Sequence, residues 1–258
     1  MNQREINLNA DLGESFGAWK MGDDGAMLAV VASANIACGF HAGDPLVMRQ
    51  TVRQALAQGV SLGAHPSFPD LQGFGRRRID MAPAELEAAI VYQVGALQAL
   101  AAAEGGALSH VKPHGALHNM ACADPALAET VVRAVRAAGR ELLLLAPPCS
   151  ELALAGERLG LRVALEVFAD RAYQDDGQLV PRSQPGAMVH GAEAALAHVL
   201  RMLQEQAIVS VSGRRLPTAI DSICVHGDSP DAVQTAGAIR QGLEAAGYAI
   251  VGLDRLGR

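Results

Sequence analysis

Lysine is almost missing from this sequence. Its 258 residues include 19 arginines but only two lysines, Lys20 and Lys112. Aromatic residues make up 3% and charged residues 19%, so a large core has to be filled with alanine and aliphatic side chains, as expected for helices packed on a parallel sheet. The net charge is −6 and the one basic cluster is the triplet 76–78, which argues against a nucleic-acid partner.

Paired cysteines, an apolar leader and a membrane-spanning run are missing as well. The four cysteines lie far apart without a CxxC pair, which argues against a disulfide framework and favours a reduced, cytoplasmic setting. The N-terminal residues MNQREINLNADLGE contain no apolar stretch typical of a signal peptide. The charge-free stretch 88–103 contains Gln93, Gly95 and Gln98. We interpret it as a buried, alanine-rich helix, too short and too polar for a bilayer, and expect no membrane partner.

What is present is an alternation of short strand-like runs and helical segments, typical of parallel strands joined by crossover helices. Strands are expected at 5–11, 32–38, 60–65, 108–113, 141–146, 162–169 and 222–226, with one more at 249–253. Helices are expected at 44–58, 84–103, 125–138, 192–206 and 230–245, three of them opened by Asp-Pro or Ser-Pro pairs that suit a helix N-terminus. Insertions at 173–179 and 208–216 carry hairpin signals. We expect one α/β barrel domain over residues 1–258.

Polar and apolar residues alternate within most of these strands. The first places Asn7, Asn9 and Asp11 on one face, five others alternate similarly, and only the run 142–145 is apolar on both faces. Because helices cover the outside of a parallel barrel, the polar face has to point inward. Buried polar groups cost about 2–7 kcal/mol each unless they are satisfied, so a polar interior indicates a site. An antiparallel sheet with one wet face would also alternate, but the helix-length connections favour the barrel.

The polar faces become richer toward the C-terminal ends of the strands, where barrel enzymes carry their catalytic groups. In a chain that so strongly prefers arginine, a lysine at a strand end suggests a need for a compact, tunable cation. The residues that we predict to be catalytic are Asp11, Glu14, His41, His65, Lys112, His114, Asp170, Arg171 and His226.

Other polar residues have two interpretations. Asp44 and Asp228 suit helix N-caps as well as chemistry, and Arg76 and Arg77 either clamp an anionic substrate or belong to a surface loop. Three histidines in or near helices are interpreted as structural or exposed: His118, His190 and His198.

Metal and nucleotide motifs give less guidance. Asp11, His41 and His65 would make a facial set of ligands, but HExxH, HxH and paired-cysteine spacings are missing, so a divalent metal stays open. No GxxxxGK[ST] loop and no GxGxxG after a strand is present, so the chain shows no nucleotide site of its own.

Five sequence blocks resemble the LamB/YcsF family: INLNADLGESFG, ANIACGFHAGDP, GAHPSFPDLQGFGRR, VKPHGALHN and CVHGDSPDA. The resemblance runs from about Glu5 to Leu253 and shows no departure at the motif positions. It implies an irregular, seven-stranded (β/α) barrel of the glycoside hydrolase/deacetylase type. It also implies ATP-dependent hydrolysis of 5-oxo-L-proline to L-glutamate (5-oxoprolinase activity) together with two partner subunits, B and C. The missing phosphate loop then assigns ATP to the partners.

Hydrolysis of a five-membered lactam needs an activated water, a stabilised oxyanion and a proton for the departing nitrogen. We assign the general base to Asp11, with His41 or His65 orienting the water. Lys112 would stabilise negative charge on the lactam oxygen or on a phosphoryl group attached there.

The remaining roles go to three residues. His114 or His226 would protonate the nitrogen, and Arg171 would hold the substrate carboxylate. Two alternatives stay open: a stand-alone, metal-dependent amide or sugar deacetylase, and a non-catalytic carrier or scaffold for a partner ATPase.

Overall fold

The computed structural model describes residues 4–225 and 231–256, which contain ten strands and eight helices. The strands are β1 (Arg4–Leu12), β2 (Ser33–Ala37), β3 (Ser61–His65), β4 (Leu108–Val111), β5 (Leu143–Ala146), β6 (Val163–Phe168), β7 (Ala207–Val209), β8 (Arg215–Pro217), β9 (Ser222–Val225) and β10 (Tyr248–Ile250). The helices are α1 (Asp24–Leu28), α2 (Pro45–Ala57), α3 (Pro83–Ala103), α4 (Gly115–Ala123), α5 (Pro125–Ala138), α6 (Glu151–Arg158), α7 (Ala192–Glu205) and α8 (Ala232–Ala245).

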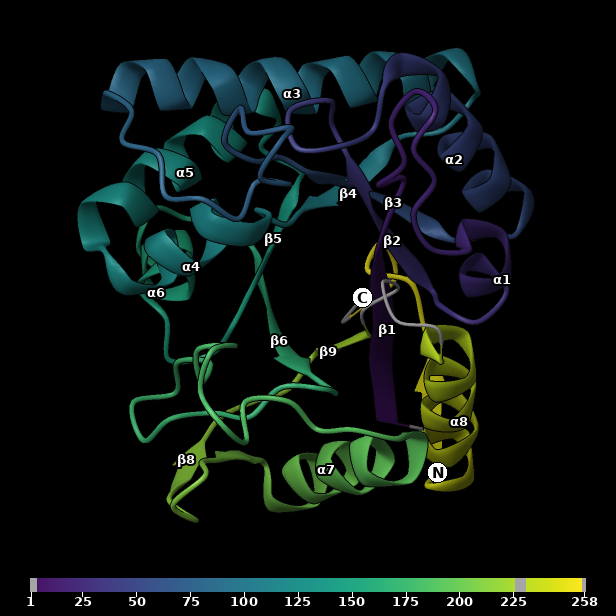
Figure 1. The fold of residues 1–258 in the computed structure, drawn as a ribbon, viewed down its shortest axis with the longest axis vertical. Coiled ribbons are helices and arrows are strands. Elements are labelled where there is room, and N and C mark those ends of the chain that lie inside the picture. The colour runs from purple at the N-terminus through teal and green to yellow at the C-terminus, as the bar shows by residue number, and fades with distance from the viewer. Residues whose placement is uncertain (1–3, 226–230, 257–258) are drawn as a thin grey trace.

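Seven of the strands are parallel and close into a barrel. They pair in the order β1-β2-β3-β4-β5-β6-β9, and β9 returns to β1, where Asn7 pairs with Ser222. The register shifts between Leu62 and Gly63 where β3 meets β4, so the barrel is irregular. Figure 1 shows the helices around the strands, with α3 above, α7 below and α8 beside β1. The predicted α/β barrel is confirmed.

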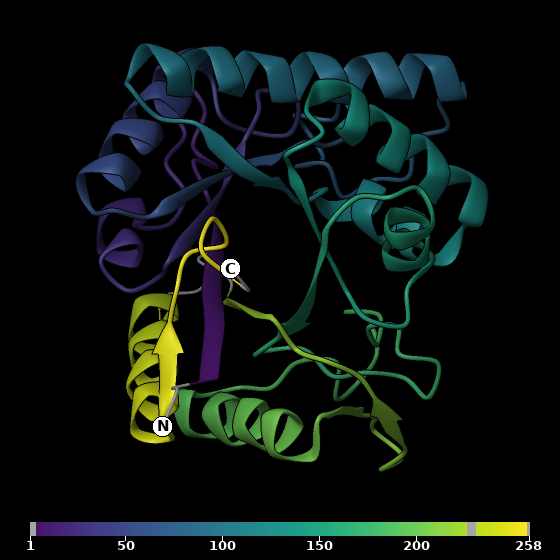
Figure 2. The same cartoon turned by 180° about the vertical axis from the view of Figure 1, so that it is seen from behind.

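β10 lies outside this closed circle. It pairs in parallel with the beginning of β1, so that Arg4 is opposite Tyr248, and Figure 2 shows it between β1 and α8. All eight predicted strands are found, with ends displaced by a few residues.

The predicted helices at 44–58, 84–103, 125–138 and 192–206 are found as α2, α3, α5 and α7, and the described part of 230–245 contains α8. Asp44 is the N-cap of α2, because its Oδ1 accepts from the backbone N–H of Leu46 and Val47. The sequence does not predict α1, α4 and α6, because helices of 5, 9 and 8 residues contain too few turns for a clear apolar period.

Helix α3 corrects one prediction about the charge-free stretch. The helix begins at Pro83, before the predicted stretch, and its 21 residues are long and apolar enough to cross a membrane by length and composition, contrary to the prediction that it is too short and too polar. Only 33% of its most apolar 18-residue window is buried. Its inner face packs on the barrel through Leu86, Ile90 and Val94. Gln93, also buried, accepts from the backbone N–H of Ser67 and donates to its carbonyl. The polar residue in the middle of the helix therefore serves a contact within the fold.

The polar faces of the strands meet inside the barrel, as predicted. Asn9 Nδ2 donates to Glu166 Oε1 (2.9 Å) and to Ser222 Oγ (2.8 Å). Asn35 Nδ2 donates to Asn9 Oδ1 (2.7 Å), and His110 Nε2 contacts Asn35 Oδ1 (2.8 Å). All five side chains are buried and come from five different strands. Mutual hydrogen bonding offsets the cost of burying them.

The two predicted insertions contact each other. Residues 173–179 form a tight loop closed by an antiparallel bridge between Tyr173 and Leu179. The second insertion is the antiparallel β7–β8 hairpin, whose turn residue Val211 donates its N–H to the carbonyl of Tyr173. The first loop also forms part of a cavity wall.

Candidate active site

The carboxyl ends of the barrel strands surround a cavity of about 580 Å³. Its walls come from the ends of β1, β3, β4 and β6, from α4, and from residues 174–182. The charged and polar side chains that line it include Asp11, Glu14, His65, Arg76, Lys112, His114, His118, Asn119, Arg171, Gln174, Gln178 and Arg182.

Lys112 lies between two carboxylates on the buried side of this cavity. Its Nζ is 3.0 Å from Asp11 Oδ1, 3.2 Å from Glu166 Oε1 and 3.1 Å from Cys224 Sγ. Burial disfavours the charged amine, but the negative charges around it outweigh burial and raise the pKa of Lys112 well above its ordinary value. The side chain is therefore a fixed ammonium group, suited to stabilising negative charge and unsuited to accepting a proton.

Asp11 connects Lys112 to the histidines. Its Oδ1 also accepts from Asn35 Nδ2 (2.9 Å), and its Oδ2 is 3.3 Å from His65 Nε2. The polar network of the barrel interior thus orients the carboxylate, and the second oxygen faces the cluster described next.

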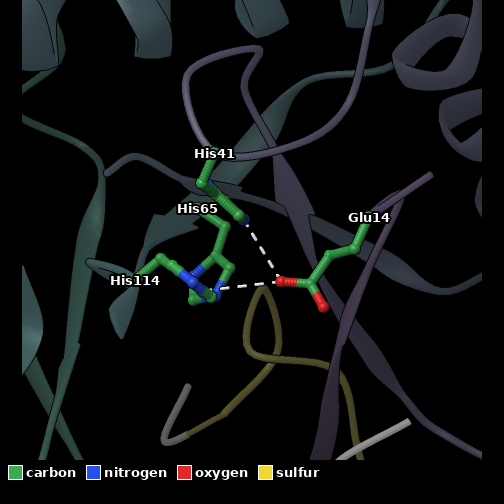
Figure 3. A group of neighbouring side chains, drawn as sticks. All are labelled: Glu14, His41, His65 and His114. Carbon is green, nitrogen blue, oxygen red and sulfur yellow. Dashed lines mark hydrogen bonds and ion pairs between the residues drawn. The ribbon is translucent and has the colours of Figure 1, made fainter. Parts of the chain in front are cut away.

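Glu14 and three histidines form a compact cluster (Figure 3). Glu14 Oε1 is 3.2 Å from His41 Nε2 and 3.4 Å from His114 Nδ1, and His65 Nε2 is 3.0 Å from His114 Nδ1. The rings of His41 and His114 stack in parallel with centroids 3.7 Å apart. One ligand atom from each residue lies within 4.8 Å of those of the others. Imidazole nitrogen and carboxylate oxygen are donors that zinc and related divalent ions bind.

The outer hydrogen bonds of two histidines favour a bound cation. His65 Nδ1 is 2.6 Å from the carbonyl oxygen of Lys112, and His114 Nε2 is 2.9 Å from that of Phe74. A carbonyl only accepts, so both of these nitrogens carry the proton, and the lone pairs of His65 Nε2 and His114 Nδ1 face each other. Metal-binding histidines are commonly oriented in this way. Burial lowers the pKa of His114 well below its ordinary value, so protonation of that ring is unfavourable. The cluster fits a divalent metal.

The loop after β3 closes over this cluster and requires a glycine. Gly75 has a φ of +64°, and a Cβ there would lie 2.8 Å from His114 Cδ2 and 2.9 Å from His41 Cβ. Its carbonyl accepts from the backbone N–H of Ala116, which ties the loop to α4.

Most of the predicted residues come together. Asp11, Glu14, His41, His65, Lys112 and His114 form the continuous set of contacts described above, and Arg171 lines the same cavity. Asp170 is half-buried and is not among the described residues that line this cavity. His226 lies outside the described residues, as does Asp228.

Two further expectations are refined. The facial metal set named Asp11, His41 and His65, whereas the clustered ligand atoms come from Glu14, His41, His65 and His114, and Asp11 Oδ2 lies beside them at 3.3 Å from His65 Nε2. Of the two candidate clamp residues, Arg76 lines the cavity, whereas the guanidinium of Arg77 pairs with Asp70.

Sequence reasoning missed two residues. Glu166 shows the inward parity on β6, but its pairing with Lys112 depends on distances across the barrel. His118 was interpreted as structural or exposed, yet it is buried and lines the cavity. Its spacing of four residues from His114, on the helix that begins just after it, is the signal that could have found it.

The chain has close counterparts among known proteins. A model of the LamB/YcsF family matches residues 6–257. The chain belongs to the LamB/YcsF family. A relative from Azoarcus sp. (strain BH72), named as the A subunit of 5-oxoprolinase, is 67% identical over 98% of this chain and 99% of its own length.

Solved structures agree with this family assignment. The structure of a lactam utilization protein from Thermus thermophilus has a TM-score of 0.91 at 44% identity, covering 96% of this chain and 99% of the other. The catalytic domain of a peptidoglycan N-acetylglucosamine deacetylase from Eubacterium rectale has a TM-score of 0.52 at 12% identity, with 97% and 89% covered. That second likeness shows that this chain shares its fold with the deacetylase domain, and nothing about activity.

Proposed function

We propose that this chain is the A subunit of a 5-oxoprolinase, a hydrolase that opens the cyclic amide 5-oxo-L-proline to L-glutamate. The observation that carries the proposal is the 67% identity, over 98% of the chain, to a relative named as the A subunit of that enzyme. The name of the solved relative, a lactam utilization protein, supports the same class of substrate. The deacetylase alternative has only the shared fold in its favour.

The residues around Lys112 supply the charges that this reaction needs. Asp11 takes a proton from the attacking water and returns it to the ring nitrogen as the C–N bond breaks, which balances the hydrolysis. Lys112, held as an ammonium group, stabilises negative charge on the amide oxygen or on a phosphoryl group attached there. His114 Nδ1 belongs to the metal cluster and its Nε2 donates to the carbonyl of Phe74, so we no longer assign protonation of the ring nitrogen to His114; the other candidate, His226, lies outside the described residues.

The cluster next to Asp11 is the place for a divalent metal in this proposal. Glu14, His41, His65 and His114 would hold it, and the ion would supply Lewis-acid stabilisation of developing negative charge. The backbone carbonyls behind His65 and His114 keep those rings in the tautomer that can bind a cation.

ATP and the partner subunits complete the proposal. An amide is a poor electrophile, so we infer that the lactam oxygen first takes the terminal phosphoryl group of ATP, which releases ADP. Water then adds to the ring carbon and the C–N bond breaks, and a second water releases phosphate from the resulting acyl phosphate to give L-glutamate. The chain contains no GxxxxGK[ST] loop, which supports nucleotide binding on partner subunits B and C. The word "subunit" in the relatives' name supports a multi-subunit complex. We expect that complex to be cytoplasmic.

Turnover of 5-oxo-L-proline with ATP tests this function, measured as glutamate release by the chain alone and together with subunits B and C. We expect turnover only in the complete mixture. Lys112→Ala and Asp11→Asn should each reduce it by about 10²–10³-fold, the usual effect of removing one charge-stabilising group. Lys20→Ala, at the other lysine, which is exposed, is the matched control. Full cleavage by B and C without this chain would refute the proposal, and near-normal turnover in both variants would remove the assigned roles.

Metal content tests the cluster independently. The purified chain should bind one divalent ion, and His65→Gln should lose it, whereas the exposed His190→Gln should retain it. Equal metal content in all three proteins would refute the site.

A further inference from the structure

Two buried side chains that line the cavity have hydrogen-bonding atoms without a partner. His118 and Arg171 are only 5% and 7% exposed. Neither ring nitrogen of His118 has a hydrogen-bond partner, and neither has Arg171 Nε. Buried polar groups in folded proteins are nearly always paired, so three unpaired atoms on two residues that line one cavity point to a partner that enters this cavity.

The charges around these atoms favour an anionic ligand. Arg171 forms no ion pair with any residue in the described ranges, and its Nη2 donates only to the carbonyl of Val180. Burial lowers the pKa of Arg171, and the nearby positive charge of Arg182 lowers it further. Arg182 lines the same cavity. A buried cation, Arg171, beside an exposed second one, Arg182, is stabilised by a bound negative charge.

His118 is suited to donate one further hydrogen bond. Burial and nearby charges, including those of Lys112 and Arg171, lower the pKa of His118 to about 3. The neutral ring has one N–H to donate and one lone pair. It stands edge-on to Phe168 at a centroid distance of 6.1 Å, and this contact restricts its orientation.

We propose that His118, Arg171 and Arg182 form a subsite for an oxyanion of the substrate, on the cavity wall made by α4 and the segment after β6. This inference extends the proposed function, because it adds two residues to Arg171 and defines where the acidic part of the ligand binds. The oxyanion is either the carboxylate of 5-oxo-L-proline or a phosphoryl group on its ring oxygen. The cavity of about 580 Å³ has room for both, since nine heavy atoms of 5-oxo-L-proline at a water's share of roughly 30 Å³ each need less than half of it, and the four more of a phosphoryl group still fit.

Calorimetric binding to the full-length chain, with three probes, tests this subsite. The probes are 5-oxo-L-proline, 2-pyrrolidinone, which is the same ring without the carboxylate, and inorganic phosphate. The variants are Arg182→Gln and His118→Gln, with exposed Arg78→Gln as the matched control, and urea unfolding verifies that each variant is folded. In wild type, at least one anionic probe should bind about tenfold more tightly than 2-pyrrolidinone, the size expected for a charge-assisted hydrogen bond.

The pattern of losses identifies the oxyanion. If both variants lose about tenfold in affinity for 5-oxo-L-proline but not for 2-pyrrolidinone, the subsite binds the carboxylate. If the loss is confined to inorganic phosphate, it binds the phosphoryl group. If neither anion binds, or if both variants bind like Arg78→Gln, the subsite is wrong. Because binding is measured without partners, normal turnover in the complex would then leave the proposed function standing.

Discussion

Replacement of Lys112 by methionine gives the sharpest test of the charge arrangement in the barrel. The ammonium group lies 3.0 Å from Asp11 Oδ1 and 3.2 Å from Glu166 Oε1. At an effective dielectric constant of about 20, each attraction is worth roughly 5 kcal/mol before desolvation. Burying the amine cancels much of this gain, but removal of one partner from a buried pair still costs about 3–5 kcal/mol. We expect Lys112→Met to lower the free energy of unfolding by that amount.

Glu166 is where most of this loss should appear. Its side chain is fully buried, and burial raises its pKa, an effect that Lys112 opposes. Without Lys112 the pKa rises further, and a raised carboxyl pKa gives stability that is present at low pH and is lost as pH rises through the folded value. The penalty of Lys112→Met should therefore be larger at pH 8 than at pH 5.5. Glu166→Gln in the same chain should recover about 1–3 kcal/mol, the usual coupling energy of groups in contact.

Urea unfolding of the purified chain at both pH values measures these differences, with Lys20→Met as the exposed control expected to change stability by less than about 0.5 kcal/mol. The reasoning fails if Lys112→Met lowers the free energy of unfolding by the same amount at both pH values, and if Glu166→Gln in the same chain lowers it further instead of raising it. That outcome would mean that the two carboxylates are not held by the lysine charge.

Three further predictions concern the histidines and their supports. Gly75→Ala should reduce the affinity for a divalent metal by at least about tenfold, as outer-shell changes commonly do, because the new Cβ meets His114 and His41. Gly105→Ala is the control: Gly105 also has a positive φ, but the space around it is open, so this variant should bind metal like wild type. Equal metal affinities of the two variants would refute the steric argument. Metal binding should release protons, because burial raises the pKa of Glu14 and the metal-free cluster therefore holds protons that the metal displaces. Calorimetry in buffers of different ionisation enthalpy measures this release, and identical binding enthalpies would contradict it. Burial lowers the pKa of His110 to about 3, below its ordinary 6.5, so the contribution of the neutral ring to the free energy of unfolding is present above pH 6.5 and is lost as pH falls. Between pH 7 and pH 5, the free energy of unfolding of the metal-free wild type, measured in urea, should fall by roughly 2 kcal/mol more than that of His110→Gln. Parallel pH profiles of the two proteins would disprove this.

The sequence predicts the side chains on the barrel strands better than those on the loops and helices that line the cavity. A strand has a fixed two-residue period, so the inward direction of Asn9, Asn35 and His110 follows once the strands are known to be parallel. The same reasoning brings Asp11 and Lys112 to one end of the barrel, where they are found 3.0 Å apart. These predictions rest on local geometry and on one global fact, the closure of the sheet.

The walls depend on tertiary contacts that leave little trace in the sequence. His118 lies on a helix of nine residues that the sequence does not predict, and the direction of its ring is set by packing against Phe168. Arg76 and Arg77 are neighbours in the sequence, yet one lines the cavity and the other pairs with Asp70. Which of two adjacent arginines faces a ligand is decided by a loop conformation, and composition and spacing do not encode that choice.

The distribution of charge across the cavity explains how a small acidic lactam could be oriented. The ends of β1, β3 and β4 contribute Asp11, Glu14, His65 and His114, a side of the cavity that fits a cation. The wall after β6 contributes Arg171 and Arg182 and requires an anion. A substrate with an acidic group on one side of its ring and an amide on the other is repelled when reversed, because its negative charge would then meet the carboxylates. The two walls therefore select one orientation, in which the amide faces Asp11 and Lys112 and the acidic group faces the arginines.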